Sequence, residues 1–237
     1  MKILAISCST NFGSIAVGEN QKILEKIEWE RAQSHGELVT PYLQEITEKV
    51  GWDFSEIDLI AVDKGPGSFT GVRVAINSVK ALAYSFETPI WAENSLRIMA
   101  EACPVSEKEL FCCLNAFKNE VFISSYKNKN ERWEENLDAQ SIEVEKLPDL
   151  IESKSIDFFG DAIEPYLDRL PEEFKSQVNF LNIQPAKPKA SDLLSICFKE
   201  YNSEQTLDWK SLNSLYIKLS AAEEKLKKGL LKPLPKI

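Results

Sequence analysis

Residues 58–86 read DLIAVDKGPGSFTGVRVAINSVKALAYSF, and this stretch decides the class of the fold. It opens with a strand, Asp58 to Asp63, whose continuous apolar centre is typical of a strand buried on both faces. A glycine-rich loop follows, and apolar residues then recur at helical spacing from Val72 to Phe86. A buried strand joined to a helix by a short loop predicts an α/β protein.

The loop itself is the strongest local signal, and two interpretations of it stay open. Its glycines allow close backbone approach and leave amide donors at a helix N-terminus, which is a geometry that can hold an anion. The residues that would form such a cradle are Gly65, Gly67, Ser68, Thr70 and Gly71. The loop lacks the Gly-Lys-Ser/Thr of a Walker loop and the Gly-x-Gly-x-x-Gly of a dinucleotide site. A tight structural turn is the alternative, and Phe69 favours it because an aromatic ring indicates packing.

Upstream of this unit the sequence predicts three short strands and one helix. The strands are Lys2 to Ser7, Ser14 to Gly18 and Lys22 to Glu28. The helix carries an apolar face made of Leu38, Val39, Tyr42, Leu43, Ile46 and Val50, and it ends at Gly51. Its start stays open between a capping box at Ser34 to Glu37, which leaves Pro41 inside the helix, and Thr40 as the cap.

Downstream, the pattern continues with a strand from Pro89 to Ala92 and a helix from Ser95 to Ala102, and then it restarts. Three further strands are expected at Leu110 to Ala116, Glu120 to Tyr126 and Glu131 to Leu137. Shorter elements follow: helices at Lys146 to Ser153, Asp161 to Leu170 and Ser191 to Tyr201, and strands at Ile156 to Phe159 and Val178 to Leu181. Two lobes that each open with three β-strands indicate a duplicated α/β architecture. We expect lobes at residues 1–106 and 107–224, followed by a basic, solvated tail at 225–237.

Composition excludes several classes of protein. The 237 residues carry 28 basic and 37 acidic side chains, a net charge of −9, which argues against tight binding of nucleic acid by this chain alone. The five cysteines form no Cys-x-x-Cys pair and His35 is the single histidine, so neither a disulfide framework nor a zinc site is expected. No uncharged apolar run approaches ~18 residues, so no membrane span is expected. These features predict a soluble protein of the cytoplasm.

The end of the first strand also argues against independent catalysis. Nucleotide-dependent proteins with duplicated lobes place an acidic residue there to organise a metal and phosphates, whereas this chain has Ser7. No carboxylate near the first strand is apparent, so no metal site is expected. His35 as a general base or metal ligand, or as the partner of a nucleophilic Cys8, is weighed against a surface or capping role.

The two helices of the first lobe form the remaining candidate site. The helix from Val72 to Phe86 presents large apolar residues on one stripe and small residues elsewhere, so it can pack against two neighbours. Either both faces are buried within the lobe, or the pair of helices is a docking surface. The candidate interface residues are His35, Leu38, Val39, Tyr42, Leu43, Ile46, Arg73, Ala75, Ile76 and Val79.

Several motifs together resemble one family. They are Ile3-Leu4-Ala5-Ile6 with Ser9-Thr10, His35-Gly36-Glu37-Leu38 with Pro41, and Gly65-Pro66-Gly67-Ser68-Phe69-Thr70-Gly71-Val72-Arg73. Asn115-Ala116-Phe117-Lys118-Asn119-Glu120-Val121-Phe122 and Ser214-Leu215-Tyr216-Ile217-Lys218 add to the likeness. The chain is thereby identified as a member of the TsaB (YeaZ) family. Most of the matching motifs lie within about the first 125 residues. Departures are Ser7, where the family has Asp, and Asn115-Ala116-Phe117, where it has Asp-Ala-Arg.

The resemblance implies an actin/hexokinase/Hsp70-like (ASKHA) fold and a catalytically inert relative of the transferase TsaD. Such a subunit docks on TsaD through helices 36–50 and 70–86, the ATPase TsaE joins them, and the complex forms N6-threonylcarbamoyladenosine (t6A) at position 37 of tRNA. The resemblance also implies a homodimer when the partner is missing, contact with tRNA only through the complex, no cofactor on this chain alone, and ATP or ADP at the shared interface. The alternatives are an independent ATP-dependent kinase or carbamoyl transferase and, last, an M22-type metal-dependent peptidase.

Overall fold

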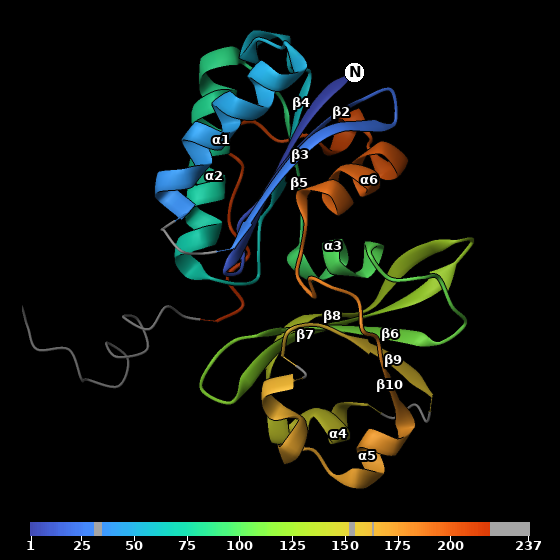
Figure 1. The fold of residues 1–237 in the computed structure, drawn as a ribbon. Coiled ribbons are helices and arrows are strands. Elements are labelled where there is room, and N and C mark those ends of the chain that lie inside the picture. The colour runs from blue at the N-terminus through green and yellow to red at the C-terminus, as the bar shows by residue number, and fades with distance from the viewer. Residues whose placement is uncertain (31–34, 152–154, 163, 219–237) are drawn as a thin grey trace, which may run out of the picture.

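Two five-stranded mixed sheets, one in each lobe, organise the computed structural model, which describes residues 1–30, 35–151, 155–162 and 164–218 (Figure 1). The first sheet has the order β3-β2-β1-β4-β5, and the second has the order β10-β9-β6-β7-β8. The first contains β1 (Lys2–Ser7), β2 (Phe12–Glu19), β3 (Lys22–Glu30), β4 (Leu59–Asp63) and β5 (Ile90–Glu93). The second contains β6 (Glu109–Asn115), β7 (Glu120–Lys129), β8 (Arg132–Glu143), β9 (Ile156–Phe159) and β10 (Val178–Phe180).

The two sheets share one topology. In each, three antiparallel strands come first in the chain, and two further strands then add in parallel beside the first one. Strand β6 therefore corresponds to β1, and β9 corresponds to β4. The predicted duplicated α/β fold, with three strands opening each lobe, is confirmed.

The helices are α1 (His35–Val50), α2 (Phe69–Phe86), α3 (Ser95–Glu101), α4 (Leu147–Leu150), α5 (Glu172–Gln177) and α6 (Ala190–Glu200). Short 3₁₀ turns lie at Phe54–Glu56, Val144–Lys146, Glu164–Arg169 and Ser203–Gln205. Helix α1 begins at His35 with Pro41 inside it, which decides between the two starts left open by the sequence. Two predicted helices are shorter: Asp161 to Leu170 reduces to a 3₁₀ helix, and Lys146 to Ser153 reduces to a 3₁₀ turn followed by α4.

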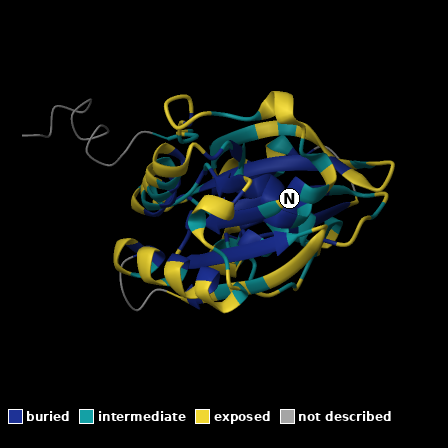
Figure 2. Cartoon of the chain, turned by 90° about the horizontal axis from the view of Figure 1, so that it is seen from above, coloured by how far each residue is buried: buried dark blue, intermediate teal, exposed yellow. Residues whose placement is uncertain are grey.

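Four apolar clusters hold the layers together, and Figure 2 shows the dark blue strands enclosed by helices with exposed outer faces. Helices α1 and α2 cover one face of the first sheet, and α6 covers the other through Leu193, Leu194 and Ile196. Helix α3 packs instead on the second sheet through Leu96, Met99 and Ala100. Both helices therefore pack across the position at residues 106 and 107 where the sequence analysis places the lobe boundary.

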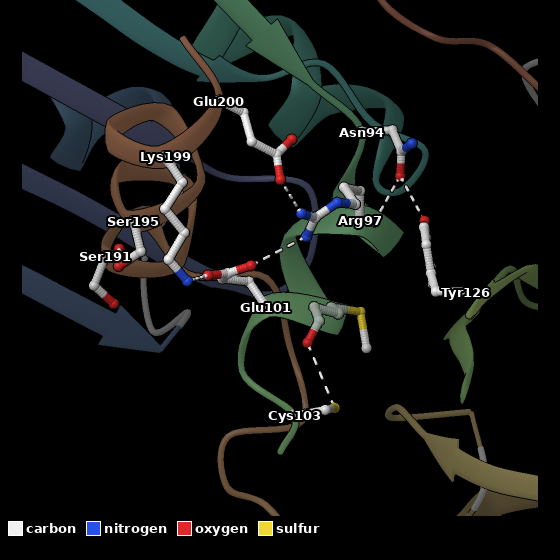
Figure 3. A network of polar contacts seen from close by, with 10 residues as sticks. Asn94, Arg97, Glu101, Cys103, Tyr126, Ser191, Ser195, Lys199 and Glu200 are labelled. Carbon is white, nitrogen blue, oxygen red and sulfur yellow. Dashed lines mark hydrogen bonds and ion pairs between the residues drawn. The ribbon is translucent and has the colours of Figure 1, made fainter. Parts of the chain in front are cut away.

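A network of ion pairs joins α3 to α6 (Figure 3). The buried Arg97 of α3 donates to Glu101 at 3.2 Å and to Glu200 of α6 at 2.6 Å. Lys199 of α6 contacts Glu101 in turn. Because two elements from different lobes share this buried guanidinium, the network fixes one helix against the other.

After α6 the chain returns along the first lobe as an extended segment, Leu207–Lys218, which we call the strap. Leu207 pairs with Ile90 at the edge of β5, and Leu212 is buried among the α1 and α2 side chains. The Leu215 amide then donates to the Lys64 carbonyl beside the glycine-rich loop, and Lys218 reaches Glu120 in the second lobe. The predicted basic tail, 225–237, lies outside the described residues.

Candidate partner-binding site

The glycine-rich loop is packed tightly against the turn that follows β1. A Cβ atom on Gly71 would lie 1.9 Å from the Cys8 carbonyl oxygen, so only glycine fits there. Four amides of the loop region are used internally: Gly65 donates to Asp63, Ser68 to the Ser9 carbonyl, Gly71 to the Ser68 hydroxyl, and Val72 to the Ser68 carbonyl. An anion cradle needs such amides to point outward, so this arrangement favours the structural turn over the cradle.

Beneath the loop lies a buried carboxylate that sequence reasoning missed. Asp63 ends β4 and accepts hydrogen bonds from the hydroxyls of Ser7 at 2.7 Å, Ser9 at 2.6 Å and Ser95 at 2.6 Å, and from the Gly65 amide at 3.0 Å. The expectation that no carboxylate lies near the end of the first strand is therefore wrong. Strands β1 and β4 are parallel neighbours, so their carboxyl ends meet at one edge of the sheet, and that rule could have located Asp63.

The surroundings of Asp63 do not resemble a metal centre. Its side chain is fully buried, and burial raises its pKa against the lowering effect of the four hydrogen bonds. All four donors are hydroxyl or amide groups that occupy the carboxylate oxygens. Among the described residues, no group of three or more His, Cys, Asp or Glu side chains is placed to hold a metal ion.

His35 is buried and tied into the core on both ring nitrogens. Its Nδ1 accepts a hydrogen bond from the Trp29 indole at 3.0 Å, and its Nε2 lies 2.7 Å from the Thr10 carbonyl oxygen. Because the indole can only donate and the carbonyl can only accept, the ring is neutral with its proton on Nε2. Cys8 is likewise buried, and burial together with the nearby Asp63 raises its thiol pKa, so this pair does not form an activated nucleophile.

The predicted interface residues divide into core and surface. The structure buries His35, Val39, Leu43, Ile46, Ala75, Ile76 and Val79 in the first lobe, so these side chains cannot themselves contact a partner. Their assignment to the interface is corrected, because the apolar stripe of each helix faces the first sheet. Leu38 and Tyr42 are half-buried, and Arg73 is exposed. Of the predicted residues, Arg73 therefore lies on the outer surface of the two helices, and the other exposed positions there were not predicted.

Helix α2 presents one exposed stripe, which we call the α2 stripe: Arg73, Asn77, Ala81 and Tyr84. Their spacing of three and four residues places them on one side of the helix. The middle of the stripe is small or polar, whereas Tyr84 at one end is 68% exposed. A helix with small central residues and larger end residues can accept a second helix across it.

Two aromatic residues of the strap support the ends of the α2 stripe. The Arg73 guanidinium lies 3.7 Å above the Phe69 ring, and its Nε donates to the Tyr216 hydroxyl at 2.8 Å. At the other end, the Tyr84 ring packs edge-on against Trp209 with centroids 5.2 Å apart. The family motif that contains Tyr216 thus lies beside the motif that contains Arg73.

A hollow of about 270 Å³ lies where the glycine-rich loop, the β6–β7 turn and the strap meet. It is lined by Phe69, Phe117, Phe122, Tyr216 and Lys218 among others. Phe117 is 69% exposed and has a left-handed φ of 59°, which is unusual for a bulky residue. This hollow is the place where the two lobes and the strap converge.

The two sheets have the same topology, α3 packs on the second sheet and α6 packs on the first. Together these features define a duplicated α/β protein of the ASKHA class. The sequence profile described as TsaD, tRNA N6-adenosine threonylcarbamoyltransferase, matches residues 22–230. The chain is 30% identical over 155 residues to TsaB of Buchnera aphidicola, covering 62% of this chain and 70% of the relative. It belongs to the TsaD family, and within that family to its TsaB (YeaZ) members.

Other comparisons extend over nearly the whole chain. TsaB of Haemophilus influenzae is 25% identical over 239 residues, covering 95% of this chain and 97% of the relative. TsaB of Escherichia coli is 24% identical over 232 residues, with coverage of 95% and 98%. The solved YeaZ structure from Pseudomonas aeruginosa superposes with a TM-score of 0.79 at 22% identity, covering 91% of this chain and 99% of that one, which supports the fold. In the described part of the chain, no helix is both long and apolar enough to cross a membrane.

Proposed function

We propose that this chain is the non-catalytic subunit that binds and activates a TsaD-type transferase in forming t6A at position 37 of tRNA. The relatives named TsaB are described as biosynthesis proteins for threonylcarbamoyladenosine, which supports a role in the same pathway. The observation that carries the proposal is the exposed α2 stripe beside α1, which offers a helical surface to a partner. The carboxylate at the sheet edge, Asp63, is occupied by hydrogen bonds from Ser7 and Ser9, which argues against catalysis there.

The docking surface is formed by the outward sides of α1 and α2. On α1 the exposed residues include Thr40, Pro41 and Gln44, and on α2 they are the members of the α2 stripe. We expect the association to bury on the order of 1,200 to 2,000 Å² in total, as stable complexes of this kind do. The other parts of the assembly follow the family: TsaE joins the complex, tRNA is bound through the complex, and ATP or ADP lies at a subunit boundary. Without its partner, the chain would form a homodimer.

The binding test inserts a charge into the middle of the α2 stripe. Ala81→Glu should weaken binding of the transferase subunit from the same organism by at least 100-fold, because a carboxylate would be buried without a partner. The matched control is Ser176→Glu on the exposed side of α5 in the second lobe, which should bind like the wild type. Calorimetric titration measures both, and equal affinity of Ala81→Glu and the wild type would place the interface elsewhere.

An independent ATP-dependent enzyme is the competing function, and one measurement separates the two. Asp63 would have to release its hydroxyl partners before it could hold magnesium. We therefore expect no micromolar binding when ATP and magnesium are titrated into the isolated chain. Micromolar binding with turnover would favour the enzyme. The peptidase alternative has no support from His35, whose two nitrogens are bonded inside the core.

A further inference from the structure

We infer that the strap is a working part of the docking surface: Tyr216 and Trp209 hold Arg73 and Tyr84 as the two anchors that grip the transferase subunit. This inference rests on the proposed function and deepens it, because it names the residues that bind and the chemistry that they recognise. The partner surface that fits is a helix with a carboxylate opposite Arg73 and an apolar hollow opposite Tyr84.

Arg73 is prepared for a carboxylate by its surroundings. Its guanidinium stacks on Phe69, and the Tyr216 hydroxyl accepts from Nε, so the side chain is held in place while the residue stays exposed to solvent. No carboxylate in the described part of the chain pairs with Arg73. By contrast, ion pairs with Glu side chains are formed by Lys2, Lys49, Arg97 and Lys218. An ordered, unpaired guanidinium binds a carboxylate at a reduced cost in side-chain entropy.

Tyr84 is prepared in the same way for an apolar hollow. It is 68% exposed, yet its ring is held by the edge of Trp209 and so has little freedom to fold back. Large exposed aromatic side chains of this kind are the commonest anchors of protein interfaces. Eleven residues of helix separate the two anchors, which is about 16 Å along the axis and matches roughly three turns of a partner helix.

The charge of the chain decides between two possible occupants. A second copy would bring another net charge of −9 to the interface, so self-association through this surface is opposed by repulsion. A different chain that offers a single well-placed carboxylate to Arg73 does not meet that cost. We therefore assign the surface to the transferase subunit wherever that subunit is present, and to a second copy only in its absence.

The experiment compares four variants of the full chain for affinity to the transferase subunit from the same organism. Arg73→Gln should weaken binding about tenfold, because it removes a charge-assisted hydrogen bond. Tyr84→Ala should weaken it about thirtyfold, as the truncation of an anchor does. The matched controls lie outside the docking surface: Val105→Ala, which is 46% exposed, and Arg132→Gln, which is also exposed. Both controls should bind like the wild type.

A positioning role for Tyr216 is tested separately. Tyr216→Phe keeps the ring on Phe69 but removes the hydroxyl, and it should weaken binding about fivefold through Arg73. In the Arg73→Gln background the same change should have no further effect, since its target is gone. The affinity of the wild type should also fall with added salt more steeply than that of Arg73→Gln, which a merely structural role would not produce.

The outcomes are distinct. Normal binding by Arg73→Gln and Tyr84→Ala, with Ala81→Glu still defective, would overturn the anchors and leave the proposed function intact. Loss of self-association in these variants without loss of transferase binding would likewise overturn the assignment of the occupant. Failure of the wild type to bind the transferase at all would overturn the proposed function and this inference together.

Discussion

The two lobes repeat one sheet topology but finish the corresponding sheet edge in different ways. At the end of β4, Asp63 is enclosed by three hydroxyls and one amide and is covered by the glycine-rich loop. After β9, the corresponding Asp161 accepts from the Asn115 amide at 2.9 Å, and the neighbouring turn leaves Phe117 exposed. One lobe therefore has a closed edge and the other an open one.

The difference extends to the connections that leave these edges. The 18-residue helix α2 follows the closed edge, whereas a 3₁₀ turn and the six-residue α5 follow the open one. Among the described residues, it is the first lobe that has a long helix with an exposed outer side beside a second long helix. The two sheets thus share one topology, whereas the long helices that follow the first sheet form the surface that we propose for a partner.

Three predictions test this comparison, beginning with a feature that both lobes share. A Cβ atom on Gly71 would lie 1.9 Å from the Cys8 carbonyl, and one on Gly160 would lie 1.7 Å from the Cys113 carbonyl. We expect Gly71→Ala and Gly160→Ala each to lower the free energy of unfolding by about 4 kcal/mol, because the neighbouring backbone must shift. Gly51→Ala is the control: its φ is positive, like that of Gly160, but nothing lies within 4 Å of its Cβ position, so about 1 kcal/mol is expected. Urea unfolding measures all three, and equal losses would refute the steric argument.

The second prediction concerns the contact that joins the lobes. Arg97→Ala should cost about 3 kcal/mol, because it leaves Glu101 and Glu200 without their shared cation at a largely buried site. The comparison is Lys129→Ala, which breaks an exposed pair with Glu134 and should cost about 0.5 kcal/mol or less. Thermal and urea unfolding are suitable measurements. A loss for Arg97→Ala as small as that for Lys129→Ala would show that the lobes are held together by apolar packing alone.

The third prediction addresses the feature that differs, and its effect is the smallest. Asp63→Asn should lower stability by about 2 kcal/mol at neutral pH, because the amide keeps only one of the two acceptor oxygens and sets an NH2 group against hydroxyl donors. Asp161→Asn, whose carboxylate accepts from the Asn115 amide, should cost about 1 kcal/mol. Urea unfolding measures both. Similar losses at the two positions would contradict the contrast between a closed and an open edge.

Acidity gives a second readout of the same pair. Burial raises the pKa of both Asp63 and Asp161, so the folded chain binds more protons than the unfolded chain above the usual aspartate pKa of about 3.9. The stability contributed by each carboxyl group is therefore full below that value and declines as the pH rises through the raised pKa. The Asn variants lack this decline. In unfolding experiments, the difference in free energy of unfolding between the wild type and each Asn variant should therefore become smaller as the pH rises.

Much of the fold could be predicted because the spacing of apolar residues along the sequence indicates strands and helices locally. Alternating and continuous apolar runs located the strands, and the restart near residue 107 indicated the duplication. The exchange of α3 and α6 could not be predicted, since no local pattern states which of two similar sheets an apolar helix will cover. The candidate site was harder to predict, because the sequence does not show which surface an apolar helix face will cover. Val39 and Ala75 belong to an apolar stripe that suits either a core or an interface, and only the tertiary structure assigns it to the core.

Asp63 and Tyr216 illustrate two kinds of missing information. Asp63 ends its strand as Ser7 ends its own, so the parallel pairing of β1 and β4 is sufficient to bring them together. The contact of Arg73 with Tyr216 spans 143 positions and depends on the path of the strap, which has no periodic signal.

The crossing of α6 has a consequence for the order in which the protein is made. The inner face of the first sheet, with Ile3, Ala5 and Leu59, is covered by residues 190–200. On the ribosome, that apolar face is therefore complete long before its cover emerges. A shortened product lacking α6 would expose this face to water and to other nascent chains, so we expect the first lobe alone to be prone to aggregation.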